Sequence, residues 1–159
     1  VGIKNARLKP LFIEQYLDNP VEHEIEVHSQ EVIERRDIVE VGNLAASWKG
    51  TSQLVMVMLP VILERAGYKW GIFTATGQVE RLIRKLCLEP ITLCEASEAR
   101  VNNEGDVWGD YYQQSTPHVF AGSLKGIEQR LSQHRLLRHI LKFFGTQIDE
   151  IVAQIELAK

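Results

Sequence analysis

The residues best suited to bind a ligand lie where an apolar stretch, predicted to be a strand, runs into a predicted helix. Residues 46–52 read Ala-Ser-Trp-Lys-Gly-Thr-Ser, and apolar residues recur at helical spacing from Leu54 onward. A helix that begins near Gly50 would present unpaired N–H groups and a favourable dipole to an anion such as a pyrophosphate. The alternative is an ordinary turn in which Thr51 or Ser52 caps the helix.

Glu40 is chemically notable because it interrupts a nearly continuous apolar run from Asp37 to Ala46. A carboxylate inside a buried strand is costly unless it has a partner, and such groups are frequent at functional sites. Glu40 is therefore a candidate base. The alternative is that its side chain points outward or pairs with Arg36.

The histidines and cysteines do not have the spacing of metal ligands. His23 and His28 are five residues apart and miss the i, i+4 spacing of a helical zinc pair. Cys87 and Cys94 have no CxxC partner, which indicates a reducing compartment. The expectation is a cytoplasmic protein without a metal, although the chain starts at Val1 without an initiator Met, so an export signal could precede it.

Hydrophobic periodicity predicts the elements that would position these side chains. The predicted strands are 1–6, 37–46, 69–74, 91–96, 108–113 and 117–123, and the predicted helices begin at Pro10 or cover 51–66, 78–88, 124–144 and 146–157. Residues 20–36 are interpreted as a surface helix or loop. The alternation of strands and helices predicts an α/β fold with parallel neighbouring strands, in which 37–46 is central and ligands bind beyond the carboxyl ends of the strands.

Length and composition indicate one globular domain. The chain has 159 residues, of which 45% are hydrophobic and 25% are charged. Its net charge of -3 supplies no positive field, so no nucleic-acid partner is expected. The most apolar stretch, Leu54 to Leu63, is interrupted by Pro60 and is too short to cross a bilayer.

The C-terminal stretch from Arg130 to Phe144 combines basic residues with an apolar side. This composition is typical of a helix that lies on a membrane surface. The alternative is a helix that packs on the domain or on a second subunit and leaves its Arg and Lys in water. Ile148, Ile151 and Val152 continue the apolar side, which also fits a homodimer formed through the C-terminal helices.

Several motifs in a fixed order give the chain a family resemblance. They are Leu-Phe-Ile-Glu-Gln-Tyr-Leu at 11–17, Ile-Val-Glu-Val-Gly-Asn-Leu-Ala at 38–45, Phe-Thr-Ala-Thr at 73–76, Trp-Gly-Asp-Tyr-Tyr at 108–112 and Pro-His-Val-Phe-Ala-Gly at 117–122. Together they resemble the thermostable hemolysin family over roughly residues 1–123. That family in turn resembles the GNAT acyltransferases and, among them, the acyl-homoserine-lactone synthases. The resemblance implies a GNAT-like mixed, partly parallel sheet flanked by helices and lacking its first elements, with a helical C-terminal extension at 124–159.

The same resemblance implies a site for an acyl donor, either acyl-CoA or an acyl carrier protein. The donor-binding residues would be Ser47, Lys49, Gly50, Thr51 and Ser52. The GNAT phosphate loop reads Gln/Arg-x-x-Gly-x-Gly/Ala, and of this pattern only Gly50 is retained. Acyl transfer to an amine also needs a base and donors to the developing oxyanion, for which the candidates are Glu40, Tyr111 and Tyr112.

The acceptor pocket implied by the resemblance would be lined by Asn43, Thr74, Thr76, Trp108 and His118. His118 could also act as a base near neutral pH. Simpler roles exist for the others: Asn43 can satisfy backbone groups, either threonine can cap the next helix, and Trp108 can pack in the core.

The preferred hypothesis from the sequence is an N-acyltransferase that moves an acyl group to a small amine such as an amino acid. One alternative is a non-enzymatic, membrane-active protein that uses the basic C-terminal helix. A second is a catalytically inactive GNAT-like interaction module.

Overall fold

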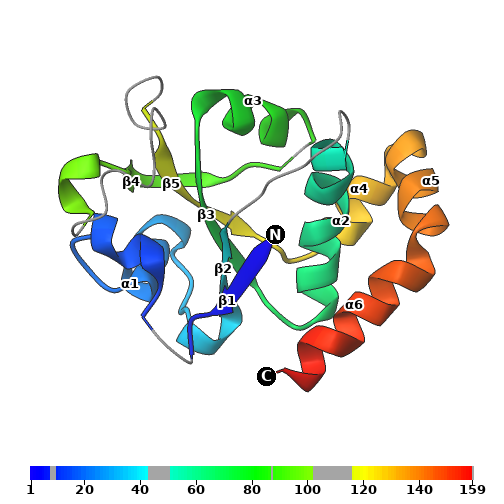
Figure 1. Cartoon of the computed structure of the whole chain (residues 1–159), viewed down its shortest axis with the longest axis horizontal. Helices are drawn as coiled ribbons and strands as arrows, with labels where there is room; N and C mark the ends of the chain where they lie inside the picture. The colour runs from blue at the N-terminus through cyan, green and yellow to red at the C-terminus, as the bar shows by residue number, and fades with distance from the viewer. Residues whose placement is uncertain (8–9, 43–50, 87, 102–115, 159) are drawn as a thin grey trace.

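Five strands form one mixed sheet in the order β1-β2-β3-β5-β4 (Figure 1). The computed structural model describes residues 1–7, 10–42, 51–86, 88–101 and 116–158. The strands are β1 Gly2–Asn5, β2 Ile38–Gly42, β3 Trp70–Ala75, β4 Ile91–Glu95 and β5 His118–Ser123. The predicted strand at 108–113 lies outside the described residues.

The strand directions confirm a mixed α/β fold. β2 and β3 are parallel, with Glu40 opposite Ile72, whereas β1 is antiparallel to β2. β5 is antiparallel to both β3 and β4, so β4 runs in the same direction as β3. The carboxyl ends of β2, β3 and β4 therefore lie at the same edge of the sheet.

The prediction of parallel neighbours is right for β2 and β3 and wrong for β3 and β4, because β5 lies between them. The burial of each strand explains this order. Val119, Phe120 and Ala121 in β5 are at most 1% exposed. This strand therefore needs packed side chains over both faces of the sheet and a neighbouring strand on each side. No residue of β4 is fully buried, which suits an edge strand. β3 is the middle strand, and β2 lies next to it.

Helices connect and cover the strands. The α-helices are α1 Val21–Ser29, α2 Thr51–Arg65, α3 Gly77–Lys85, α4 Ile127–Ser132, α5 Arg135–Phe143 and α6 Gly145–Leu157, and the 3-10 helices are η1 Phe12–Tyr16, η2 Arg35–Asp37 and η3 Glu98–Arg100. The predicted helix after Pro10 is only the short η1, because the backbone is extended at Leu17. The predicted stretch 124–144 divides into α4 and α5, which are separated at Gln133 and His134.

The two faces of the sheet pack against different helices. Ile38, Ile72 and Val119 share one core with Val21 and Ile25 of α1. On the other face, Val39 packs with residues of α2 and α6, among them Leu63 and Val152. Alternation along each strand produces this division, because successive side chains point to opposite faces. Figure 1 shows the two sides, with α1 at the left and α2 among the C-terminal helices at the right.

The C-terminal helices pack around α2 through a second apolar core, which includes Val61, Leu131 and Ile148. Charged side chains fix the ends of these helices. Arg65 at the end of α2 pairs with Glu128 of α4 and with Asp149 of α6, the latter at 2.6 Å. α2 thus connects the sheet to all three C-terminal helices.

Glu64 of α2 stabilises the start of α4. Its carboxylate accepts hydrogen bonds from the backbone N–H groups of Gly126 and Glu128, at 2.5 and 3.0 Å. Gly126 has a φ of 68°, a conformation that costs a glycine little. The N–H groups that no helical partner can satisfy are therefore bound by a carboxylate from a neighbouring helix.

Leu131 and Leu136 provide a matched test of this packing. Leu131 is 0% exposed and Leu136 is 70% exposed. We expect Leu131→Ala to lower the free energy of unfolding by about 2–5 kcal/mol, because it leaves a cavity in the helical core. Leu136→Ala should change it by less than about 0.5 kcal/mol. Urea unfolding followed by circular dichroism measures both, and equal losses would contradict the packing described.

Candidate functional site

Glu40 is buried in β2, and its carboxylate holds the start of η1. The side chain is 7% exposed. Its two oxygens accept hydrogen bonds from the backbone N–H groups of Phe12 and Ile13, at 2.9 and 3.0 Å. The interpretation that Glu40 points outward or pairs with Arg36 is therefore wrong, and Arg36 instead pairs with Glu34. The burial of Glu40 is compensated because the carboxylate is the partner of otherwise unpaired amides.

Glu14 completes the same cap. Its Oε2 accepts a hydrogen bond from the N–H of Leu11 at 2.8 Å, so the three amides from Leu11 to Ile13 are all bound by carboxylates. Leu11 itself offers no side-chain acceptor at the position where Ser, Thr, Asp or Asn usually caps a helix. The cap of η1 depends on tertiary contacts and not on local sequence.

Arg35 ties η1 to the segments around it. Its guanidinium donates to both carboxylate oxygens of Glu14 and to Glu22 of α1, each at 2.7 Å, and its Nε donates to the carbonyl of Ala6 at 2.9 Å. The paired, bidentate geometry is the strong form of this interaction. The hydrogen bond from Arg35 lowers the pKa of Glu14 below its ordinary value of 4.5.

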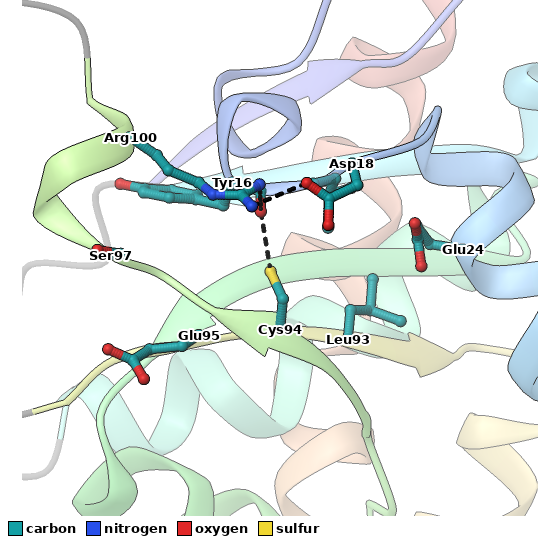
Figure 2. A pocket seen from close by; sticks show the side chains of 9 residues that line it. Tyr16, Asp18, Glu24, Leu93, Cys94, Glu95, Ser97 and Arg100 are labelled. Atoms are coloured by element: carbon teal, nitrogen blue, oxygen red, sulfur yellow. Dashed lines mark hydrogen bonds and ion pairs between the residues drawn. The ribbon is translucent and has the colours of Figure 1, made fainter.

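An open pocket of about 390 Å³ lies between the end of η1 and the carboxyl end of β4 (Figure 2). Its walls come from η1 and the residues after it, from α1, and from β4 and η3. The lining residues are Tyr16, Leu17, Asp18, Glu24, Leu93, Cys94, Glu95, Ser97 and Arg100. The cap made by Glu40 therefore fixes one end of a 3-10 helix whose other end forms a wall of this pocket.

The carbonyl of Tyr16 joins the two walls. It accepts hydrogen bonds from Arg100 at 2.9 Å and from the thiol of Cys94 at 3.4 Å. Arg100 also pairs with Asp18 at 2.8 Å, and Figure 2 shows its side chain reaching from η3 toward that carboxylate. Burial raises the pKa of the Cys94 thiol, so the thiol is protonated near neutral pH and is not poised as a nucleophile.

The charge of the pocket is predominantly negative. Asp18 and Glu24 supply two carboxylates on the side of Cys94, and Arg100 supplies the single positive group. Glu95 also borders the pocket, but it lies opposite His118, so its side chain points to the other face of the sheet, away from Cys94 (Figure 2). Arg100 is already paired with Asp18, whereas within the described residues Glu24 has no ion-pair partner. Such a pocket favours a positively charged polar ligand. Across the described ranges, no group of three or more His, Cys, Asp or Glu side chains could hold a metal ion.

The register of the sheet relates this pocket to Thr74. Thr74 of β3 lies opposite Val119 of β5, and Val119 lies opposite Cys94 of β4. These residues form one row across three strands, which separates Thr74 from Cys94 by about 10 Å. Thr74 shares its face of the sheet with Ile72, the direct partner of Glu40. The pocket thus lies on the same face as Glu40 and Thr74 and at the same edge as Thr74.

Among the other described site candidates, His118 lies apart from this face. His118 lies opposite Ala75 and next to Phe120, so it points to the other face of the sheet, and its Nδ1 is 3.1 Å from the carbonyl of Thr116. Thr76 occupies the cap position of α3 but makes no side-chain cap hydrogen bond.

Seven candidates lie outside the described residues: Asn43, Ser47, Lys49, Gly50, Trp108, Tyr111 and Tyr112. Thr51 and Ser52 form the first turn of α2, which begins where the sequence predicts a helix. In the sequence, the predicted donor-site residues 47–52 follow β2 and include the first two residues of α2.

The sequence singled out Glu40, but not the other cap residues, Glu14 and Arg35, nor the residues of the pocket. Asp18, Cys94 and Arg100 come from separate segments, with Tyr16 and Arg100 84 positions apart. One usable signal was Glu14, because an acidic residue three positions after a helix start is a capping pattern. Arg35 had no such signal, since its partners are set by the tertiary fold.

The fold and site together define a mixed α/β domain with a charged pocket at the carboxyl end of an edge strand. Residues 1–127 match the family model described as thermostable hemolysin, and the chain belongs to this family. The match includes all five strands and stops at the first residue of α4. No curated protein and no solved structure matches the chain. None of the described helices is long and apolar enough to cross a membrane.

Glu14 should make stability depend on pH. Since its pKa is lowered by folding, its contribution is fully present above 4.5 and is lost as the pH falls through the lowered value. We expect Glu14→Gln to reduce the free energy of unfolding by about 1–2 kcal/mol at pH 7, and the difference from wild type to narrow below pH 4.5.

Glu34→Gln is the control for this measurement, because Glu34 and its partner Arg36 are both more than half exposed. It should cost less than about 0.5 kcal/mol at either pH. Urea titrations at pH 7 and pH 3 measure both variants. A Glu14→Gln deficit that is the same at both pH values would contradict the role of Arg35.

Proposed function

We propose that this member of the thermostable hemolysin family is an N-acyltransferase that moves an acyl group from acyl-CoA or an acyl carrier protein to a small, positively charged amine. The observation that carries the proposal is the acidic pocket, which lies on the face of Glu40 and Thr74 and at the edge where β2, β3 and β4 end. Ligands of sheets that contain parallel strands commonly bind beyond this edge.

The proposed site for the acyl donor depends on the parallel pairing of β2 and β3. Ser47, Lys49 and Gly50 come shortly before α2 in the sequence, so the proposed phosphate contacts would be made next to the start of a helix. Helix starts favour anions through free N–H groups and through the dipole. A pantetheine arm that runs from there along the strand ends would bring a thioester toward Thr74.

The acceptor side rests on the charge of the pocket. Glu24 would attract an ammonium group, while Arg100 and Asp18 would orient other polar groups of the acceptor. An amino acid or a diamine fits these charges better than an anionic or a wholly apolar acceptor. Leu93 and Cys94 provide a small apolar surface against which the hydrocarbon part of the acceptor would pack.

The chemistry requires the amine nitrogen to lose a proton and attack the thioester carbonyl, after which the carbon–sulfur bond breaks and the thiol leaves with a proton. We assign no proton transfer to Glu40, because both of its oxygens accept backbone hydrogen bonds. Glu40 is a positioning residue that holds η1 against the pocket. Tyr111 and Tyr112 are the proposed proton-transfer groups.

The test measures donor and acceptor separately. Acetyl-CoA, a long-chain acyl-CoA and an acyl-loaded carrier protein should each be titrated in a thermal-shift assay, because a ligand of the native state raises its apparent stability. Thiol release with lysine, arginine or putrescine as acceptor then reports turnover. We expect Glu24→Gln to raise the KM for the amine by about tenfold or more and to leave donor binding unchanged.

Glu31→Gln is the matched control, because Glu31 is exposed and lies outside the pocket. It should change neither constant. The proposal would be abandoned if no donor shifts the melting temperature and no amine releases thiol. A KM for the amine that is insensitive to Glu24→Gln would retain acyl transfer but show that the acceptor does not bind in this pocket.

A further inference from the structure

The apolar residues of α5 are divided between two sides of the helix. Leu137, Ile140, Leu141 and Phe144 pack in the core that α5 shares with α2 and α6. This side explains why α5 packs on the chain.

Leu136 and Phe143 are not part of that core. They are 70% and 78% exposed. Since they are seven residues apart, they lie on one side of the helix, two turns from each other. Two large apolar side chains thus share one exposed strip on a single helix.

Three cations accompany this strip. Arg135, Arg138 and Lys142 follow one another at spacings of three and four residues and are all exposed. Within the described residues none of them forms an ion pair, whereas Arg65 on α2 is paired twice. Residues 129–148 contain no Asp or Glu, although the whole chain carries a net charge of -3. The exposed side of α5 is therefore a local basic surface on an acidic protein.

We propose that the exposed side of α5 docks on the surface of an anionic phospholipid membrane. Leu136 and Phe143 would enter the boundary between headgroups and acyl chains, and the three cations would contact lipid phosphates. The occupant is argued from charge complementarity and from the apolar pair beside the cations. α5 lies beyond the matched residues 1–127, and the proposal does not depend on acyl transfer.

A second copy of the chain fits this surface less well. A two-fold dimer through the same side would place the cations of one α5 against those of the other. Such contact between like charges weakens association, whereas the phosphates of an anionic membrane would neutralise the cations. A homodimer formed through this face would therefore overturn the proposal.

The experiment measures sedimentation of the full chain with vesicles of phosphatidylcholine, with and without one part in three of phosphatidylglycerol. We expect binding only to the anionic vesicles and a loss of at least about tenfold in affinity when NaCl rises from about 0.05 to about 0.5 M. We expect the triple variant Arg135→Gln, Arg138→Gln, Lys142→Gln to weaken binding by about fiftyfold or more, because each cation should contribute roughly a factor of five. Leu136→Ser with Phe143→Ser should also weaken it, by about tenfold or more.

Each variant has a control of the same chemistry elsewhere. The triple variant Arg7→Gln, Arg81→Gln, Lys85→Gln removes three exposed cations that lie outside α5. The double variant Val27→Ser, Val32→Ser changes apolar residues that are 62% and 92% exposed. Both controls should bind as wild type does, and circular dichroism should show that every variant is folded. The proposal is overturned if the anionic vesicles do not bind, if the controls lose as much binding as the α5 variants, or if analytical ultracentrifugation shows a dimer that the Leu136→Ser, Phe143→Ser variant abolishes.

Discussion

The hydrogen bonds between the Glu40 carboxylate and the amides of Phe12 and Ile13 are the constraint on which the candidate site depends. They join the buried face of β2 to a short helix that has no cap of its own. Because η1 has only five residues, the position of its start determines the position of its end. That end presents the carbonyl of Tyr16 to Cys94 and Arg100, so a contact made by β2 inside the sheet organises a pocket beside the edge strand β4.

The chain uses the same device a second time. Glu64 of α2 binds the first amides of α4, as Glu40 binds those of η1. In both cases a carboxylate from a different element supplies the cap, and the residue at the local cap position, Leu11 or Gly126, has no side chain suited to it. A cap from another element also fixes how two elements are oriented, which a local cap does not. This explains how short helices are held in defined places on a small sheet.

The sequence predicts the elements well where a run of side chains has one clear period. The strands near 38, 70, 91 and 118 and the helix at 51–65 follow from such runs. The order of the strands could not be predicted in the same way. β5 lies between β3 and β4, where it is covered on both faces and has a neighbouring strand on each side. Pairing across strands depends on packing that periodicity does not encode.

The candidate site was less predictable than the fold. Glu40 was correctly marked as unusual because it is an acid in an apolar run, but its partners are backbone amides 27 and 28 positions away, which carry no residue-type signal. The residues of the pocket likewise come from three separate segments, and only the fold makes them neighbours. Thr74 is the predicted pocket residue that the register brings into the same row as this pocket.

The most direct measurement of this account is amide hydrogen exchange by NMR on wild type and Glu40→Gln, with the amides of Phe12, Ile13 and Ile72 followed individually. If the carboxylate caps η1, Phe12 and Ile13 are protected in wild type, and the substitution lowers their protection by about tenfold or more while Ile72 changes much less. If Phe12 and Ile13 exchange in wild type as fast as the exposed residues 31–32, or if the substitution leaves their exchange unchanged, Glu40 does not hold η1.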